Sequence, residues 1–432
     1  MLIRKDIRNR QLGFSSIIRR SDLLLFMIWP LGALIHAFRY YRWPGSKVLF
    51  WLFCIFFGFL FIYADPYTEG AADSARTVAK LIALHQKPID LGQLISMFYD
   101  SDGGYTDLYQ PITLWITAFF TDDPRYLFMI YAIVFGYFYS QNIWLVLKVI
   151  DKRITVFTIL YLIAFILINP IWNINGVRMN TAMHVFLYGL LTYLLFNDKS
   201  KLLWCGVAIF IHFSFVFPLI SLIIYLITPR KTGVLFILYV VSMMINIVDL
   251  EYVRNLLSFL PGVFQSRVTG YTNLSYYEAI SLHRSSLNLQ VILVENFGKW
   301  LIHLWVFVAY LKYRTWIKHN ETLRRLFNFV LLFGAMAGIA SLVPSGGRFT
   351  VIISSIVYVI VVMLHTKIQW DALLQFVSRI TLIPVLFIIL FQIRMGFQFM
   401  GVITLLGNPV LALFVDKQTP FIEQIKGLLT LL

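Results

Sequence analysis

The sequence ITVFTILYLIAFILINPIWNINGVRMNTAMHVFLYGLLTYLLF, residues 154–196, holds two long apolar runs separated by a short polar segment. The runs cover residues 154–167 and 179–196. We expect both to form helices that cross a membrane, because apolar runs of this length with few charges are typical of buried or spanning helices. A connection this short places the polar segment at a membrane face.

The polar segment places a cation at the start of the second helix. Arg178 stands there, with Asn173 and Asn175 before it and Asn180 and His184 after it. An arginine at such a position usually has an anionic partner or a wet cavity, since its desolvation is costly. A helix start also offers free N–H groups and a positive dipole end. The pattern predicts a cradle for a phosphate or diphosphate; the alternative is an interfacial arginine that reaches lipid headgroups.

Composition identifies an integral membrane protein. Of the 432 residues, 59% are hydrophobic and only 13% are charged, about half the charged share of a soluble domain. The net charge of +15 comes from basic loops on one side of the membrane, so we expect no nucleic-acid partner. Cys54 and Cys205 lie in apolar runs and indicate neither a disulfide framework nor a zinc site. The polar, basic N-terminus does not have the pattern of a cleavable signal peptide.

The charge bias orients the chain, which we expect to form a single transmembrane domain over residues 1–432. The basic segment 1–47 is predicted to be cytoplasmic, and its apolar part, residues 23–38, is predicted to form a re-entrant or interfacial hairpin. A crossing by this part is the second choice. The acidic segment 65–123 and the segment 249–300 are predicted to be large outer-face loops.

The apolar runs predict an all-α polytopic fold with about ten crossings plus two partial elements. An amphipathic helix is expected over residues 73–85, inside the first outer loop. The crossings that we delimit cover residues 48–64, 125–149, 154–167, 179–196, 234–248, 301–310, 326–342, 350–364 and 380–391.

The apolar run 202–227 is interrupted at His212 and has basic residues at both ends. This predicts two half-helices that turn around near His212 and line an enclosed or wet cavity. A functional histidine and a structural histidine are both compatible with this position. No inverted repeat with matching interrupted segments is visible, which disfavours a secondary transporter.

Two further sites in the sequence hold charged residues near the start of a predicted helix. Asp73 and Arg76 are spaced to pair on one helix face, either as a local ion pair or as part of a site. Arg348 follows two glycines in the turn VPSGGRF and begins the next helix, an arrangement that brings backbone N–H groups close to an anion. Arg178 and Arg348 are both predicted on the outer face, where two guanidinium groups would suit a diphosphate.

The order of these features resembles the EpsG/Wzy family of polysaccharide polymerases. The resemblance extends from about residue 48 to 365 and rests on four motifs taken in sequence order. They are YADPYTEGAADSARTVAKL (63–81), NINGVRMNTA (173–182), IHFSFVFPL (211–219) and GGRFTVIISSIVYVI (346–360). Met179 follows Arg178 where many members have glutamine.

The resemblance implies a glycosyltransferase of the GT-C kind at the outer face of the bacterial cytoplasmic membrane. Such an enzyme joins undecaprenyl-diphosphate-linked oligosaccharide repeats and releases undecaprenyl diphosphate. Arg178, Arg348 and Arg76 would then hold the diphosphate, while Asp73 or His212 would activate or position the acceptor hydroxyl. Neither a metal nor another cofactor is implied.

In this interpretation four further residues are expected to bind the sugars or the acceptor: Asn175, Asn180, His184 and Arg284. The expected partners are the lipid-linked oligosaccharide, membrane lipid, a chain-length regulator and a flippase. Two alternatives stay open. An O-antigen ligase uses the same donor with a different acceptor, and a lipid-linked oligosaccharide flippase or other transporter would need a site near the membrane midplane.

Overall fold

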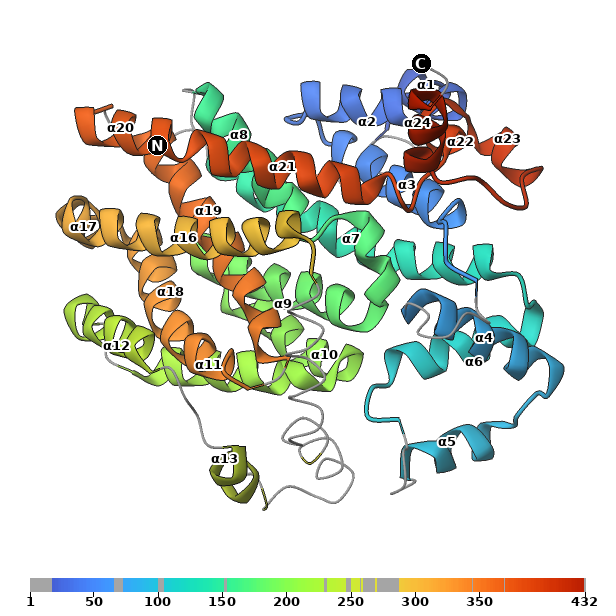
Figure 1. The fold of residues 1–432 in the computed structure, drawn as a ribbon, viewed down its shortest axis with the longest axis horizontal. Coiled ribbons are helices and arrows are strands. Elements are labelled where there is room, and N and C mark those ends of the chain that lie inside the picture. The colour runs from blue at the N-terminus through green and yellow to red at the C-terminus, as the bar shows by residue number, and fades with distance from the viewer. Residues whose placement is uncertain are drawn as a thin grey trace, which may run out of the picture.

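The computed structural model describes residues 18–65, 73–99, 105–150, 154–228, 231–245, 250–256, 258, 269, 287–343, 345–368 and 370–430. All regular secondary structure in these ranges is helical (Figure 1). The expected all-α fold is therefore confirmed for the described residues, and the apolar length of its helices fits a multi-pass membrane protein. Arg284, one of the predicted sugar-contacting residues, lies outside the described residues.

Five helices form the centre of the molecule: α7 (Pro124–Val149), α8 (Val156–Ile168), α9 (Val177–Phe196), α18 (Glu321–Ala340) and α19 (Thr350–Lys367). Helix α9 packs against α7 and α18, and α19 packs against α8 and α18. Most residues of α9 and α19 are buried. A helix that is apolar on all sides and surrounded by other helices belongs to the core of a large bundle.

Helix α3 (Ser46–Phe59) packs closely against α7 through small residues. A Cβ added at Gly58 would lie 2.3 Å from the Cβ of Ala132, and one added at Gly136 would lie 2.5 Å from the Cβ of Cys54. Contacts this close let two backbones approach each other, which is how helices associate where the surroundings are as apolar as the side chains.

The N-terminal apolar run forms two short helices that fold back on each other, and its predicted re-entrant or interfacial position stays a prediction. The two helices are α1 (Arg20–Ile28) and α2 (Pro30–Arg39), and proline begins the second helix where its missing N–H has no cost. His36 Nε2 lies 3.4 Å from Asp22 Oδ1, so the end of α2 returns to the start of α1.

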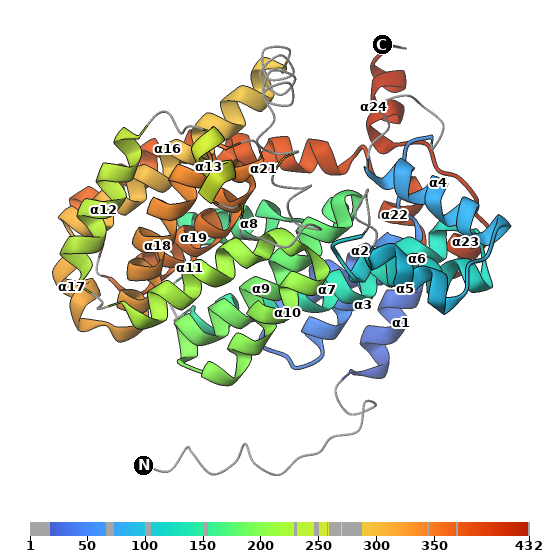
Figure 2. The same ribbon diagram turned by 90° about the horizontal axis from the view of Figure 1, so that it is seen from below.

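The acidic segment contains α4 (Asp73–Gln86), α5 (Leu91–Tyr99) and α6 (Tyr109–Phe120). These helices gather at one end of the molecule, and α12 (Thr232–Met244) and α17 (Arg314–His319) lie at the opposite end (Figures 1 and 2). The predicted amphipathic helix is confirmed, because α4 buries Val78 and Leu81.

The predicted break at His212 is also present. Helix α10 (Leu203–Ile211) ends there, and η4 (Phe213–Phe215) leads into α11 (Val216–Ile227). His212 has φ −150° and ψ 114°, which is extended backbone that interrupts the helical hydrogen bonds.

The two half-helices turn around at this break. The carbonyl of Phe210, near the end of α10, accepts a hydrogen bond from Leu108 N at the start of α6. Tyr225, near the end of α11, donates to the carbonyl of Arg325, whose guanidinium bonds the carbonyl of Leu194 near the end of α9. Because α10 also begins just after the end of α9, both outer ends of the pair lie at that end of α9.

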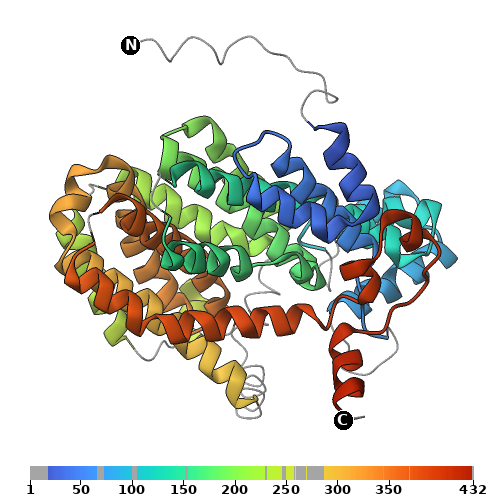
Figure 3. The same ribbon diagram turned by 90° about the horizontal axis from the view of Figure 1, so that it is seen from above.

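The remaining elements complete the bundle. They are η2 (Ile171–Gly176), η3 (Lys199–Leu202), α13 (Leu250–Leu256), α16 (Leu289–Leu311), η5 (Gly346–Phe349), α20 (Ala372–Ile380), α21 (Leu382–Gly396), α22 (Val402–Leu406), α23 (Pro409–Leu413) and α24 (Phe421–Leu429). In Figure 3, α21 extends along one side of the molecule and α24 projects away from it.

The expected number of about ten crossings is not confirmed. In the described ranges, five helical stretches are long and apolar enough to cross a membrane, and a sixth counts if α20 and α21, bent by 40°, are one span. One stretch, residues 156–196, includes both α8 and α9. Between Asn169 and His184 the chain folds back on itself, because His184 Nε2 lies 2.8 Å from the carbonyl oxygen of Asn169. Helices α3 and α12 are apolar but shorter than a full span.

Several predicted boundaries differ from the helices of the structure, and α18, for example, begins at Glu321 rather than at residue 326. Helix α16 begins at Leu289, so the second outer loop ends earlier than residue 300 and the crossing at 301–310 is longer than expected. Its Glu295 and Lys299 have the i, i+4 spacing that a helix surface tolerates well. Helix α21 continues to Gly396, beyond residue 391. Helix α3 stops at Phe59 because the following segment is extended, and Ile62 N donates to Phe399 O.

Candidate functional site

The carboxylate of Asp107 is the centre of a buried polar cluster. Its Oδ2 accepts hydrogen bonds from Arg178 Nη1 at 2.9 Å and from His212 Nδ1 at 3.0 Å. Its Oδ1 accepts one from the backbone N–H of Phe213 at 2.8 Å. The Asp107 side chain is only 2% exposed. We refer to Asp107, Arg178, His212 and Arg348 as the Asp107 cluster.

Local backbone geometry places these groups. Asp107 lies just before α6, and the hydrogen bond from Leu108 N to Phe210 O ties that position to the end of α10. The extended conformation at His212 ends the α10 ladder. The N–H of Phe213 is therefore free of the helix and donates to Asp107 instead. The helix break thus supplies both a side-chain donor and a backbone donor to one carboxylate.

His212 links Asp107 to Arg348. Arg348 Nη1 donates to His212 Nε2 at 3.3 Å. A guanidinium group can only donate, so Nε2 is the unprotonated ring nitrogen and Nδ1 carries the hydrogen that bonds Asp107. In this arrangement the lone pair of Nε2 is directed at Arg348. A carboxylate on the other side of the ring holds that tautomer.

The turn before α19 holds Arg348 in place. Ser345 has φ 65°, and its carbonyl accepts a hydrogen bond from Arg348 Nε at 2.6 Å. A Cβ added at Gly346 would lie 1.8 Å from the backbone oxygen of Ala340, so this position accepts only glycine. Phe349 packs on Phe217, with ring centroids 5.0 Å apart, and this contact attaches the turn to the broken helix.

The electrostatics of the cluster favour an ionised Asp107 and an additional anion. Burial disfavours the carboxylate, but the hydrogen bonds from His212 and Phe213 and the charge of Arg178 outweigh it, so the pKa of Asp107 lies below its ordinary value. The cluster then holds two guanidinium groups and one carboxylate, with Arg178 on the carboxylate and Arg348 on His212. The Arg178 side chain is 41% exposed, and among the described residues its guanidinium bonds only Asp107. Part of this side chain is therefore open to a ligand.

The predicted pair Asp73 and Arg76 lies beside this cluster. The two side chains form an ion pair, and both are more than half exposed. Asp73 Oδ2 lies 3.9 Å from where a Cβ on Gly176 would be, two residues before Arg178. No hydrogen bond among the described residues joins the pair to the Asp107 cluster.

Two of the predicted asparagines stabilise the loop that precedes α9. Asn175 Oδ1 accepts from Ser74 N at 3.3 Å and attaches α4 to the loop. Asn180 Nδ2 donates to the carbonyls of Asn173 and Gly176. Their side-chain hydrogen bonds thus hold the chain that presents Arg178.

His184 lies in the core rather than at the cluster. Its Nε2 donates to the Asn169 carbonyl at 2.8 Å, and its Nδ1 lies 3.3 Å from Asn142 Nδ2. The ring is also packed against Phe135 and Tyr139. These contacts join α7 to α9. Among the described residues, no group of three or more His, Cys, Asp or Glu side chains is arranged to hold a metal ion.

Asp107 belongs to none of the motifs that predicted the site. It was one of nine acidic residues in the predicted outer loop, and nothing in the neighbouring sequence distinguishes it. Its partners Arg178 and His212 are 71 and 105 positions away in the chain. The one local signal is its place directly before an apolar helix, where a carboxylate is well placed to meet groups from other elements.

Comparison with known proteins gives one family. The model of the EpsG family matches residues 96–404, more than two thirds of the chain. The match begins and ends later in the chain than the expected range of 48–365. It includes all four residues of the Asp107 cluster, but it begins after Asp73 and Arg76. No significant match to a curated protein or to a solved structure is found. The chain therefore belongs to the EpsG family, the family of Wzy-type polysaccharide polymerases.

Proposed function

We propose that this protein joins undecaprenyl-diphosphate-linked oligosaccharide repeats at the outer face of the bacterial cytoplasmic membrane and releases undecaprenyl diphosphate. The observation that carries the proposal is the Asp107 cluster, which brings Arg178 and Arg348 from distant parts of the chain to one histidine–carboxylate pair. Glycosyl transfer from a lipid diphosphate needs this combination of a cationic site for the leaving group and a base for the acceptor.

Arg178 and Arg348 hold the diphosphate in this proposal. Arg178 is partly exposed and stands in the first turn of α9, where helix N–H groups and the helix dipole favour an anion. Negative charge on the diphosphate grows as the glycosidic bond breaks. Fixed guanidinium groups stabilise that charge more in the transition state than in the bound substrate, which lowers the barrier.

His212 is the base that we propose, in preference to Asp73. When Arg348 turns toward the diphosphate, Nε2 of His212 is released and accepts the proton of the acceptor hydroxyl. The hydroxyl oxygen then bonds to the anomeric carbon, and the bond from that carbon to the phosphate oxygen breaks with its electron pair on the diphosphate. Asp107 holds the ring in the required tautomer and stabilises the imidazolium that forms.

The test is polymerisation by the purified full-length protein in lipid nanodiscs. With undecaprenyl-diphosphate-linked repeats from the source organism, we expect longer lipid-linked glycans and free undecaprenyl diphosphate. His212→Gln should lower the rate by about 10²–10⁴-fold. His319→Gln is the matched control, since His319 is exposed and bonds only its own helix among the described residues.

The outcomes separate this function from its rivals. Transfer of glycan only to an added lipid A core acceptor would identify a ligase. Unchanged substrate that moves from one leaflet to the other would identify a transporter. Full polymerisation by His212→Gln would remove the base that we propose.

A further inference from the structure

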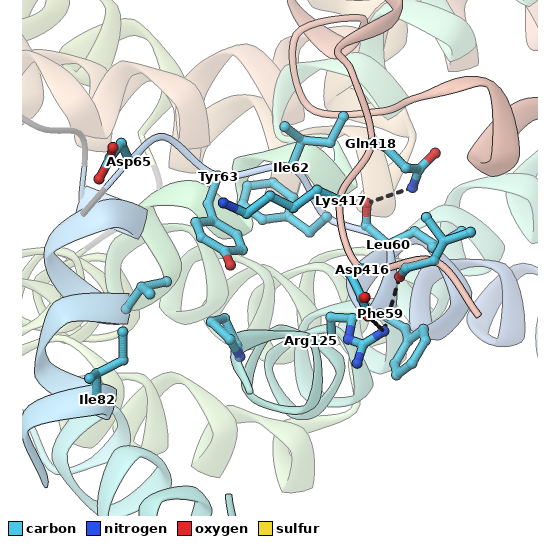
Figure 4. Close-up of a pocket in the computed structure, with 14 residues that line it drawn as sticks. Phe59, Leu60, Ile62, Tyr63, Asp65, Ile82, Arg125, Asp416, Lys417 and Gln418 are labelled. Atoms are coloured by element: carbon cyan, nitrogen blue, oxygen red, sulfur yellow. Dashed lines mark hydrogen bonds and ion pairs between the residues drawn. The ribbon is translucent and has the colours of Figure 1, made fainter. Parts of the chain in front are cut away.

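A cavity of about 480 Å³ lies apart from the Asp107 cluster. Its walls are the end of α3 with the extended residues 59–65, one face of α4, the start of α7 and the segment 415–418 (Figure 4). This volume is within the range of about 300–1,000 Å³ that is typical of small-molecule sites. Tyr63, Asp65 and Val78 of this lining belong to the motif over residues 63–81, but the other walls come from distant parts of the chain.

Backbone hydrogen bonds hold the walls of the cavity in place. Ile62 N donates to the carbonyl of Phe399, and Phe421 N donates to the carbonyl of Met400. Gln418 Nε2 donates to the carbonyl of Leu60. The segment 397–400 therefore ties the chain after α3 to the segment that follows α23 and fixes the walls of the cavity.

The lining combines an aromatic surface with hydrogen-bonding groups of both kinds. One face of the Tyr63 ring stacks on Phe128 with centroids 5.8 Å apart, and Tyr63 also lines the cavity. Burial raises the pKa of the Tyr63 phenol, so its hydroxyl is a donor at neutral pH. Lys417, whose side chain extends toward Tyr63 in Figure 4, adds donors, and the carboxylate of Asp65 adds acceptors. Apolar faces and convergent polar groups of this kind suit pyranose rings.

Arg125, one cationic group of the cavity, is not available to a phosphate. Arg125 forms ion pairs with Asp123 at 2.6 Å and with Asp416 at 3.4 Å, and it also donates to the carbonyl of Val415. Its charge is thus already neutralised.

Helix α4 connects the cavity to the Asp107 cluster. Ser74, in its first turn, bonds Asn175 in the loop that presents Arg178. Val78 and Ile82, farther along the same helix, line the cavity. At 1.5 Å per residue these positions lie about 6 and 12 Å along the helix from Ser74. Sugars attached directly to a diphosphate would extend over distances of this size.

We propose that this cavity is a saccharide subsite that binds pyranose rings of the lipid-linked glycan during polymerisation. The inference rests on the proposed function for the identity of the glycan. The aromatic wall would stack on the apolar face of a ring, and Tyr63, Lys417 and Asp65 would bond its hydroxyl groups.

The test compares two substitutions on one turn of α4. Ile82→Trp fills the cavity, whereas Ala83→Trp adds the same bulk at a neighbouring exposed position. In the polymerisation assay, we expect Ile82→Trp to raise KM by on the order of tenfold or more with a smaller change in kcat, the sign of lost substrate binding. Tyr63→Phe, which removes one hydroxyl, should raise KM by about three- to tenfold, and Tyr40→Phe should not.

Binding is measured independently of activity. The probe is the repeat oligosaccharide released by mild acid from the lipid-linked intermediates, observed by saturation-transfer difference NMR with the full-length protein in nanodiscs. We expect a signal with the wild type and with Ala83→Trp, and its loss with Ile82→Trp. Equal signals for the two tryptophan variants would overturn the subsite.

The two proposals can fail separately. If the wild type does not polymerise but the NMR signal depends on Ile82, the saccharide site stands and the proposed function falls. If the wild type polymerises and Ile82→Trp matches Ala83→Trp in KM and binding, only the subsite falls. Loss of co-purified phosphatidylglycerol from Ile82→Trp, with no oligosaccharide signal in the wild type, would make the cavity a lipid site and overturn the inference.

Discussion

At the scale of single residues, His212 has a different partner on each ring nitrogen. Nδ1 bonds the buried carboxylate of Asp107, and Nε2 accepts from Arg348. In the function that we propose, Arg348 leaves Nε2 before His212 acts as a base, which would couple diphosphate binding to acceptor activation. Such coupling would keep the base blocked until the donor lipid is present.

The arginines are predicted to act through their guanidinium geometry as well as their charge. Arg178→Lys and Arg348→Lys keep the charge but lose bidentate contact, so each should lower the polymerisation rate by about 10²–10³-fold. The rate is measured with lipid-linked repeats and purified protein. Arg379→Lys, at an exposed position with no ion pair among the described residues, should retain the wild-type rate. Full activity in either cluster variant would exclude that arginine from the site.

The buried carboxylate predicts a pH-dependent contribution to stability. Because the folded-state pKa of Asp107 is depressed, its contribution is fully present above the ordinary aspartate pKa of about 3.9 and is lost as pH falls through the folded value. Asp107→Asn should lower the unfolding free energy by about 1–3 kcal/mol at pH 7. Thermal unfolding in detergent should show the difference shrinking below about pH 4.

Glu423→Gln is the control for this titration, because Glu423 is exposed on α24 and forms no ion pair among the described residues. Glu423→Gln should leave the unfolding temperature unchanged both at pH 7 and below about pH 4. A constant difference between wild type and Asp107→Asn across the pH range would contradict the depressed pKa.

At the scale of elements, the turn η5 positions one arginine of the cluster. Gly346→Ala would place its Cβ 1.8 Å from the Ala340 carbonyl oxygen and would force the turn to move. We expect a stability loss of about 1–3 kcal/mol, as for other overpacked sites, and a large loss of polymerisation. Gly347→Ala is the matched control, because a Cβ there meets nothing within 4 Å. Thermal unfolding and the polymerisation assay measure the two effects, and equal behaviour of both variants would refute this role of the turn.

The broken helix is the other element on which the site depends. The conformation of His212 ends α10 early and releases the N–H of Phe213 to Asp107. A continuous helix through this position would keep that N–H in its own ladder and remove the donor. The break is therefore part of the site.

At the scale of the whole molecule, the charge distribution predicts the orientation. Ala83→Cys, on exposed α4, should react with a membrane-impermeant maleimide in intact cells, and Lys318→Cys, on exposed α17, should react only after permeabilisation. The native Cys54 and Cys205 are buried and will not interfere. Each of the two variants serves as the control for the other, because their cysteines are predicted on opposite sides of the membrane. The reverse pattern of labelling would place the Asp107 cluster on the cytoplasmic side.

Much of the fold followed from local patterns in the chain. The N-terminal hairpin, the amphipathic helix α4 and the break at His212 each depend on nearby apolar spacing, on proline or on charge, and each is present. The count of crossings was less predictable. Helix α3 is terminated by a backbone hydrogen bond from Ile62 to Phe399, a partner more than 300 residues away, and α16 continues through charged residues that looked like a loop.

The amino-acid sequence by itself determined the helical, membrane-embedded class of this protein and the two arginines and one histidine that we expected to matter. Helix starts, breaks and charges are local properties that a linear reading can recover. Only the tertiary structure selected Asp107 from nine acidic residues and built the cavity beside α4. A buried carboxylate is stable only where donors from several elements converge, and that convergence is set by packing among segments far apart in the chain.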